Sequence, residues 1–234
     1  MSLLRSAAGL GAVAHFGPAL TSVAPLRRLL LPSLAGVSRH PHVALTYDDG
    51  PDGSTPEFLD LLDRHGVTAT FFLLGAHVER HPAVVRDLHA RGHELAVHGW
   101  DHRCVAWKRP GLLVDDLRRT VDALTELTGA PVRWYRPPYG VLTAEALVAA
   151  RSLGLRTVLW SAWGRDWERS ATAESVAHRV SAALRPGGTV LLHDSDRTSA
   201  PGSWRATVAA SDLLLTDWST KGYDVGPLRD HRPF

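Results

Sequence analysis

From residue 42 onward the chain alternates short apolar runs with segments of helical periodicity, and this alternation constrains the fold more than any other feature of the sequence. Strand, helix and strand in repeated succession predict a parallel sheet. The apolar runs are 42–47, 69–74, 93–98, 132–136, 156–161, 189–194 and 223–228, and the helical segments between them begin near Thr55, Pro82, Leu112, Thr143 and Thr172. We therefore expect an α/β fold in which about seven parallel strands form a (β/α) barrel.

The first strand-to-helix turn favours a barrel over an open, doubly wound sheet. An open sheet of this kind usually carries a glycine-rich phosphate loop after its first strand, but no GxGxxG or GxxxxGK[ST] pattern occurs in this chain. Asp48 and Asp49 stand at that turn instead. Because carboxylates repel phosphate, a nucleotide site at this position is excluded.

Composition indicates one globular domain that does not bind nucleic acid. The chain has 234 residues, of which 44% are hydrophobic and 21% are charged, and this is enough for one large core. Its net charge is only +2, and the basic excess lies in the first 40 residues, which contain four arginines and no acid. The rest of the chain lacks the clustered basic residues of a nucleic-acid surface.

Cys104 is the single cysteine, so the chain has no internal disulfide framework and no thiolate cluster for a metal. Any metal ligands must therefore come from histidine and carboxylate side chains. The chain contains 13 histidines.

Residues 1–41 form a basic and apolar prelude to a catalytic domain at 42–234. Prolines and glycines interrupt this prelude, whereas a membrane-spanning helix needs about 20 steadily apolar residues, so we expect no integral span. The "SVA" at 22–24 resembles the end of an export signal, and "LRRLLLPSL" at 26–34 has the pattern of a short amphipathic piece for a membrane surface. We interpret the prelude as structural and expect a soluble protein, with a cytoplasmic location favoured over export or membrane association.

Ionisable and aromatic residues gather directly after the predicted strands, where barrel enzymes carry their chemistry. These segments are "DD" at 48–49, "HGWDH" at 98–102, "RPPYG" at 136–140, "WSAWGRDW" at 160–167 and "HDSD" at 193–196. Polar loops without a function would be scattered over both ends of a barrel. The concentration at one end predicts an active site there.

His98 and His102 are four residues apart, so on a helical turn their rings would point the same way and could share a cation. Asp48 or Asp49 can supply an anionic third ligand from the neighbouring strand end. A divalent ion there lowers the pKa of water from 15.7 towards about 7 and so makes a nucleophile available at neutral pH. One carboxylate would then bind the metal while the other faces the substrate.

Five segments in order resemble the motifs of the polysaccharide deacetylases of the NodB-homology type, carbohydrate esterase family 4. They are "TYDDGP", "HGWDH", "RPPYG", "WGRDW" and "LLHD", between residues 46 and 194, and the resemblance covers residues 42–228. It implies a distorted (β/α) barrel and a metal-dependent hydrolase that removes acetyl groups from an N-acetylated glycan. The implied cofactor is a divalent metal, with zinc ahead of cobalt, manganese or nickel.

The resemblance also implies a role for individual residues. Asp48 becomes the general base, His193 the general acid, and Arg136 the residue that orients Asp48. The implied metal ligands are Asp49, His98 and His102. The backbone N–H of Tyr139 becomes the oxyanion donor, and Trp160 and Leu191 line the acetyl pocket.

Two positions depart from the family's pattern. Gly99 stands where the family usually has Ser or Thr, and Trp163 stands where the fourth motif usually opens with an Asp that tunes the acid histidine. Asp166 of that motif is present, and Asp194 and Asp196 lie close to His193 in sequence, so any of the three could replace that Asp. We expect Asp196 to do so, and we expect Trp204, in the loop at 193–205, to fold over the cleft as a wall for sugar stacking.

Two alternative functions remain open. Related barrels hydrolyse other amides or cyclic imides, some of them without metal, but those lose the His pair that is intact here. A catalytically weak domain that binds sugar is the second alternative, because Trp100, Trp163, Trp167 and Trp204 are expected in loops where they could stack on sugar rings.

Overall fold

The computed structural model describes residues 27, 31, 33–109 and 111–231. The export-signal feature predicted at 22–24 lies outside these residues, and so do residues 26, 28–30 and 32 of the membrane-surface segment predicted at 26–34. Within the described residues, no helix has the length and apolarity needed to cross a bilayer.

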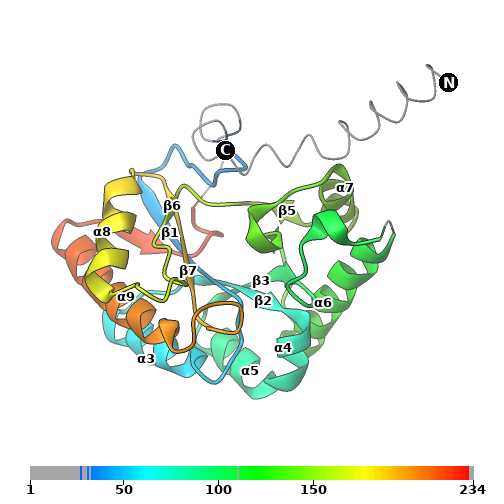
Figure 1. Ribbon diagram of the computed structural model, residues 1–234, viewed down its shortest axis with the longest axis horizontal. Coiled ribbons are helices and arrows are strands. Elements are labelled where there is room, and N and C mark those ends of the chain that lie inside the picture. The colour runs from blue at the N-terminus through cyan, green and yellow to red at the C-terminus, as the bar shows by residue number, and fades with distance from the viewer. Residues whose placement is uncertain (1–26, 28–30, 32, 110, 232–234) are drawn as a thin grey trace.

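The described residues form a parallel sheet that curls into a half-barrel (Figure 1), which confirms the predicted fold class. The strand order is β5-β4-β3-β2-β1-β7-β6, with β8 paired to the start of β1, and every pairing is parallel. The strands are β1 (His42–Asp48), β2 (Thr70–Leu74), β3 (Glu94–Gly99), β4 (Trp134–Tyr135), β5 (Arg156–Thr157), β6 (Ala162–Trp163), β7 (Thr189–His193) and β8 (Asp224–Gly226).

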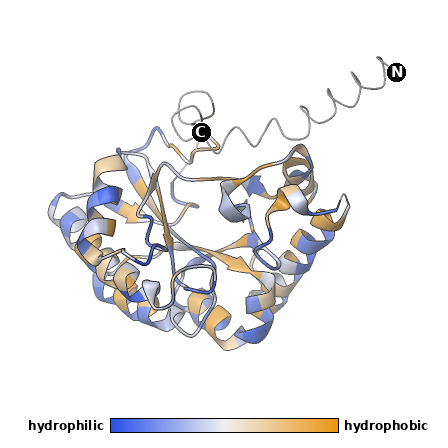
Figure 2. Cartoon of the chain, viewed as in Figure 1, coloured by the Kyte–Doolittle hydropathy of each residue, from blue (hydrophilic) through white to orange (hydrophobic). Residues whose placement is uncertain are grey.

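The helices lie around the outside of the sheet and turn their hydrophilic faces away from it (Figure 2). Thr143 and Thr172 cap two of them by accepting backbone N–H bonds, and a left-handed glycine follows α3 and α6, as the start and stop signals predict. The helices are α3 (Thr55–His65), α4 (Gly75–Arg80), α5 (Pro82–Ala90), α6 (Leu112–Thr128), α7 (Ala144–Ser152), α8 (Ala173–Ala183) and α9 (Ser203–Thr220), with short 3₁₀ turns η2 (Val105–Trp107) and η3 (Pro138–Gly140).

The run at 156–161, predicted as one strand, is a strand only at its start, in β5, and the next strand, β6, begins at residue 162 on the opposite edge of the sheet. β5 pairs with β4 and β6 pairs with β7, and residues 158–161 cross the gap between these edges. The N–H of Leu159 in this crossing donates to the carbonyl of Leu34 at 2.7 Å, outside the sheet. The distortion of the barrel is therefore located at this crossing.

The side chains of β1 divide between two environments, as the period of two in a strand requires. Val43, Leu45 and Tyr47 belong to the large hydrophobic core shared with the surrounding helices. Ala44 belongs to a small separate cluster with Phe72, Ala96, Trp134, Val158 and Leu228. The inward face of β1 therefore leads from an apolar layer at Ala44 to Asp48 at the carboxyl end.

A buried pair of histidines joins the beginning of β1 to the C-terminal segment. The Nδ1 atoms of His42 and His231 are 3.1 Å apart, and His231 Nε2 donates to the Gly36 carbonyl at 2.8 Å. Burial lowers the pKa of both rings, that of His231 to about 4. The pair is therefore neutral at neutral pH, with one ring donating to the other.

We expect this pair to make the fold sensitive to acid. Below the ordinary histidine pKa of 6.5, these histidines bind protons in the unfolded chain but stay neutral in the folded chain. The unfolding free energy therefore falls as the pH drops towards about 4. The unfolding free energy can be measured by urea unfolding at about pH 7 and at about pH 5. Between these two pH values, His231→Gln should lose less unfolding free energy than the unaltered chain, by about 1–3 kcal/mol. Equal losses in the two proteins would contradict this account.

Candidate active site

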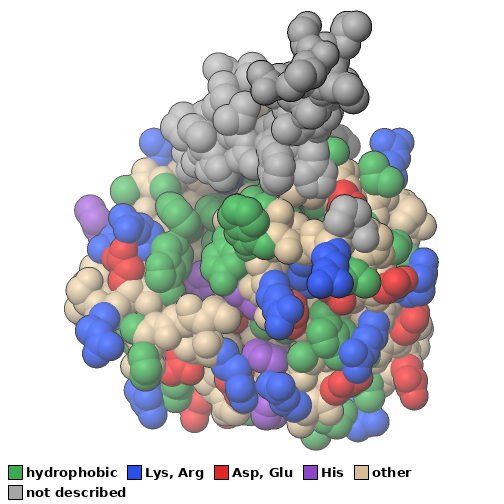
Figure 3. Space-filling model, turned by 45° about the vertical axis from the view of Figure 1, so that its right-hand side comes forward, with side chains coloured by type: hydrophobic (Ala, Val, Ile, Leu, Met, Phe, Trp, Pro, Cys, Tyr) green, Lys and Arg blue, Asp and Glu red, His purple; other side chains and the backbone are tan. Residues whose placement is uncertain are grey.

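The carboxyl ends of the strands open into a cavity of about 240 Å³. Histidine side chains are visible between hydrophobic ones in the space-filling view of this side of the molecule (Figure 3). Eight of the ten predicted site residues line the cavity: Asp48, Asp49, His98, His102, Tyr139, Trp160, Leu191 and His193. Arg136 and Trp204 are not among the lining residues.

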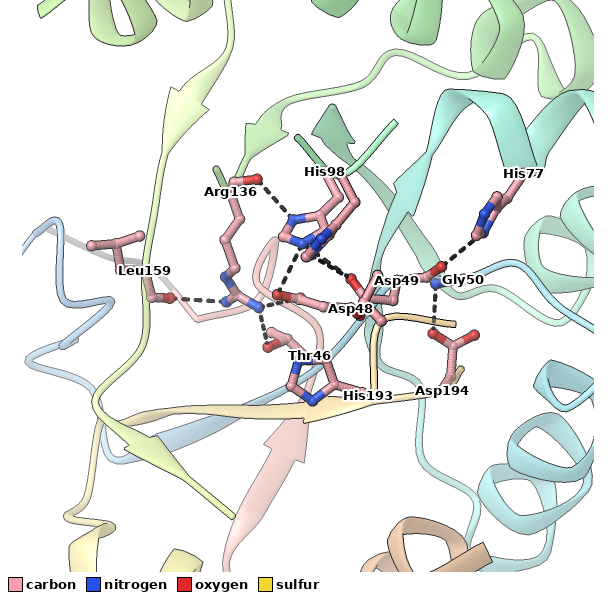
Figure 4. Close-up of polar contacts among 12 residues, drawn as sticks. Thr46, Asp48, Asp49, Gly50, His77, His98, Arg136, Leu159, His193 and Asp194 are labelled. Carbon is pink, nitrogen blue, oxygen red and sulfur yellow. Dashed lines mark hydrogen bonds and ion pairs between the residues drawn. The ribbon is translucent and has the colours of Figure 1, made fainter. Parts of the chain in front are cut away.

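Arg136 lies directly beneath the cavity, fully buried inside the barrel. Its guanidinium donates to Asp48 Oδ1 at 2.6 Å, to Thr46 Oγ1 at 2.8 Å and to the Leu159 carbonyl at 2.9 Å (Figure 4). It also lies 4.0 Å from the centre of the Phe72 ring. Asp48 is therefore held in one orientation by a buried cation.

Asp49, His98 and His102 bring three possible metal-ligand atoms within 4.8 Å of one another. Asp49 Oδ1 lies 3.3 Å from His98 Nε2 and 3.1 Å from His102 Nε2, and it is buried without a hydrogen-bond partner among the described residues. His98 Nδ1 donates to the Arg136 carbonyl at 2.8 Å, which leaves its Nε2 lone pair directed at the cluster. Two nitrogens and one carboxylate oxygen are a donor set that suits a divalent cation such as zinc.

The electrostatics of this cluster agree with a cation site. Burial alone would raise the pKa of Asp49, but its contacts with His102 and His98 outweigh burial and hold that pKa well below the usual range. The second carboxylate oxygen, Oδ2, accepts a short hydrogen bond from the Thr198 hydroxyl. The Asp49 backbone is also tied, because His77 Nδ1 donates to its carbonyl at 3.0 Å (Figure 4).

His98 and His102 lie close together, but they do not share a helical turn as their spacing predicted. His98 belongs to β3, and His102 follows a turn in which Gly99 has φ +102° and His102 has φ +59°. Thr120 of α6 braces this turn by donating to the Gly99 carbonyl at 3.2 Å. A positive φ of this size favours glycine at position 99, where the family usually has a hydroxyl residue.

The turn after β1 is fixed by Asp194, a residue whose role the sequence did not reveal. Its carboxylate accepts from the Gly50 N–H at 3.0 Å and from the Thr55 hydroxyl at 2.6 Å. A Cβ at position 50 would lie 2.2 Å from Asp194 Oδ2, so only glycine fits there. This contact locates Asp49 relative to β7.

Asp166, rather than Asp196, is the partner of His193. His193 Nδ1 donates to Asp166 Oδ1 at 3.0 Å, while the other oxygen of Asp166 accepts from the His193 N–H at 2.8 Å and the Thr207 hydroxyl at 3.0 Å. Asp196 instead accepts a short bond from the Gly202 N–H within its own loop, so the expectation for Asp196 was wrong. Burial opposes the charged form of His193, but Asp166, Asp49 and Asp48 outweigh it and raise its pKa to about 10.

An aromatic row lines one side of the cavity and ends at His193. The ring centres of Trp160 and Trp163 are 5.6 Å apart, those of Trp163 and Trp167 are 5.0 Å apart, and the edge-to-face pair of Trp167 and His193 is separated by 5.5 Å. Trp163, at the position where the family has an acid, thus becomes part of this wall. Tyr139, which is 61% exposed, also lines the cavity and packs edge-to-face on His102.

Two tryptophans considered for sugar stacking have structural positions instead. Trp204 lies in the first turn of α9, where it packs against the hydrophobic core and beneath Arg205. Trp100 packs under the guanidinium of Arg119, 3.5 Å from its ring centre, and a Cβ on Gly75 would collide with its ring. The structure therefore does not place Trp204 over the cleft as expected.

Comparisons with known proteins agree with this geometry. Residues 35–158 match the model of the family described as polysaccharide deacetylase. A chitooligosaccharide deacetylase of Bradyrhizobium sp. is 36% identical over 80% of this chain and 88% of its own length. The peptidoglycan-N-acetylglucosamine deacetylase PgdA of Listeria monocytogenes is 33% identical over 83% of this chain, which spans only 39% of that relative.

A similarity to solved structures points the same way. The crystal structure of a peptidoglycan N-acetylglucosamine deacetylase superposes with a TM-score of 0.77 and 31% identity, covering 84% of this chain and 90% of that one. Sequence and fold thus agree, and the chain belongs to the polysaccharide deacetylase family, whose members are hydrolases acting on carbon–nitrogen bonds other than peptide bonds.

Proposed function

We propose that this protein is a metal-dependent deacetylase that hydrolyses the acetamido group of an N-acetylated glycan. The observation that carries the proposal is the buried cluster of Asp49, His98 and His102, which shares one cavity with Asp48 and His193. Amide hydrolysis needs an activated water, a base that takes its proton and an acid that protonates the departing nitrogen. The chain offers one group for each of these tasks.

Asp49, His98 and His102 are the residues that would hold the metal, with zinc as the favoured ion. When bound, the divalent cation would supply Lewis acidity towards the acetyl carbonyl and towards water. The chain itself keeps two of the three ligand side chains in position, through the Arg136 carbonyl on His98 and the Thr198 hydroxyl on Asp49. Such supporting contacts typically change metal affinity 10- to 100-fold.

Asp48 is the proposed general base. Its Oδ2 lies 3.8 Å from His98 Nε2, at the edge of the metal cluster, while Oδ1 is occupied by Arg136. Arg136 is fully buried, and its contact fixes the orientation of the Asp48 carboxylate. One carboxylate oxygen therefore remains available to take a proton from water.

His193 is the proposed general acid. Its Nδ1 proton is committed to Asp166, so Nε2 is the atom that can hand a proton to the departing amine. The raised pKa keeps this ring protonated at neutral pH. Asp166 is thus a positioning residue that sets both the ring orientation and the proton affinity of His193.

The proposed binding site for the acetyl group lies between Trp160 and Leu191, two apolar residues that line the cavity. Tyr139 is held at φ +61° in η3, and its backbone N–H is the proposed donor to the oxyanion. Gly140 permits the close approach of Trp160, because a Cβ there would lie 2.6 Å from the indole ring. This pocket suits a methyl group better than a longer acyl chain.

The proposal predicts that the protein as purified releases acetate and a free amine from N-acetylglucosamine oligomers. Mass spectrometry should show the loss of acetyl groups, and a chelator should abolish the reaction until zinc, cobalt, manganese or nickel is returned. A peptide amide and a cyclic imide serve as controls for related amidases. Tight oligomer binding without acetate release at any of these metals would favour a carbohydrate-binding role instead.

Asp48→Asn and Asp49→Asn should separate the base from the metal ligand. Asp48→Asn keeps the three ligand atoms and should retain metal while losing about 10²- to 10⁴-fold in kcat. Asp49→Asn removes the anionic ligand and should lose bound metal in chelator competition. If Asp48→Asn lost the metal and Asp49→Asn retained it, the two roles would be reversed.

Asp166→Asn should move the pH dependence of kcat. Loss of the carboxylate lowers the pKa of His193, and because the acid acts in its protonated form, the upper limb of the profile should shift towards lower pH. Asp196→Asn is the matched control, since Asp196 bonds within its own loop and should leave the limb in place. A shift in Asp196→Asn without one in Asp166→Asn would refute this assignment.

A further inference from the structure

A second and wider hollow adjoins the candidate active site. Its volume is about 1010 Å³, and it shares His102, Tyr139 and Thr198 with the smaller cavity. The two spaces are therefore neighbours, with the exposed Tyr139 lining both. The chemistry at Asp48 and His193 does not use this second space.

Trp107 lines this hollow with 85% of its surface exposed. It is the most exposed large hydrophobic side chain of the described residues, although a single exposed apolar residue would by itself be unremarkable. Its position beside the active site is what distinguishes it. An indole combines a flat apolar face with a polar N–H, which suits contact with a sugar ring.

The turn that carries Trp107 is held on both sides. Val105, two residues before it, is buried in the core, and the Trp107 N–H donates to the Cys104 carbonyl at 3.1 Å. On the other side, the ammonium of Lys108 bonds to Asp101 Oδ1 at 2.9 Å and makes a short bond to Asp116 of α6. The indole is therefore presented by a braced turn, which reduces the ordering cost of binding.

The charges around the hollow indicate a neutral occupant. Asp101, Asp115 and Asp116 face Arg103, Lys108 and Arg109, so the formal charges balance. Lys108 is already paired with two of these acids. A polyanion would find no excess of positive charge here, whereas hydroxyl groups could bond to either kind of side chain.

We propose that this hollow binds the sugar unit next to the one being deacetylated, with Trp107 stacked on the apolar face of its ring. The proposal rests on the proposed function and adds a chain-length preference to it. A neutral glycan that extends from the smaller cavity past Tyr139 reaches Trp107. A monosaccharide, which occupies the smaller cavity alone, does not.

Steady-state kinetics on N-acetylglucosamine oligomers of increasing length test the proposal. Trp107→Ala should raise KM for the tetramer about five- to tenfold, with a change below about twofold for the monosaccharide. Trp107→Phe should recover most of the loss, since a flat ring remains. Equal changes for both substrates, or none for the tetramer, would overturn the proposal.

Tyr223→Ala is the matched control, because Tyr223 is an aromatic residue, 40% exposed, between α9 and β8. It should change KM for neither substrate. Thermal unfolding of the three variants should give similar midpoints, because Trp107 contributes little buried surface. A large drop in the midpoint for Trp107→Ala would show that the indole stabilises the turn and would count against a binding role.

A binding measurement separates this inference from the proposed function. The tetramer is titrated into Asp48→Asn, and into the same variant carrying Trp107→Ala, by calorimetry. Weaker binding by the second protein supports sugar binding in the hollow, even if the unaltered chain deacetylates no glycan. An unchanged Kd, together with deacetylation by the unaltered chain, would refute sugar binding in the hollow and leave the deacetylase assignment in place.

Discussion

The ion pair between Arg136 and Asp48, sealed inside the barrel, is the interaction on which the site depends. An unpaired guanidinium in a protein interior is costly, and removing one partner of such a pair typically costs about 3–5 kcal/mol. Here the charge is met by Asp48, by the Thr46 hydroxyl and by the Leu159 carbonyl. These partners come from β1 and from the crossing segment at 158–161, so the pair joins the catalytic strand to the gap of the barrel.

The same arginine also connects the proposed base to the proposed metal ligands. Its side chain orients Asp48, and its backbone carbonyl accepts the Nδ1 proton of His98. A shift of this residue would therefore move a proposed base and a proposed ligand together.

Backbone strain is concentrated in the loops around the site. The non-glycine residues recorded with positive φ in the described chain are Asp49, His102, Tyr139 and Arg165, and each follows a different strand end. Such conformations persist only where the surroundings enforce them. Asp194, Thr120 and Thr198 supply part of that enforcement, which places the ligand atoms and the Tyr139 backbone around one small volume.

The sequence by itself determined the alternation of strands and helices, the end of the barrel that carries the cavity, and eight of the residues that line it. These are local properties, because apolar periodicity, capping residues and short motifs are each written within a few positions. Only the tertiary structure decided that Asp166, 27 residues before His193, is its partner while Asp196, three residues after it, turns away. Tertiary structure also ended β5 at Thr157 within the run at 156–161, packed the partly buried Trp204 against the core and exposed Trp107. Side-chain direction depends on strand pairing and turn geometry, which sequence spacing does not contain.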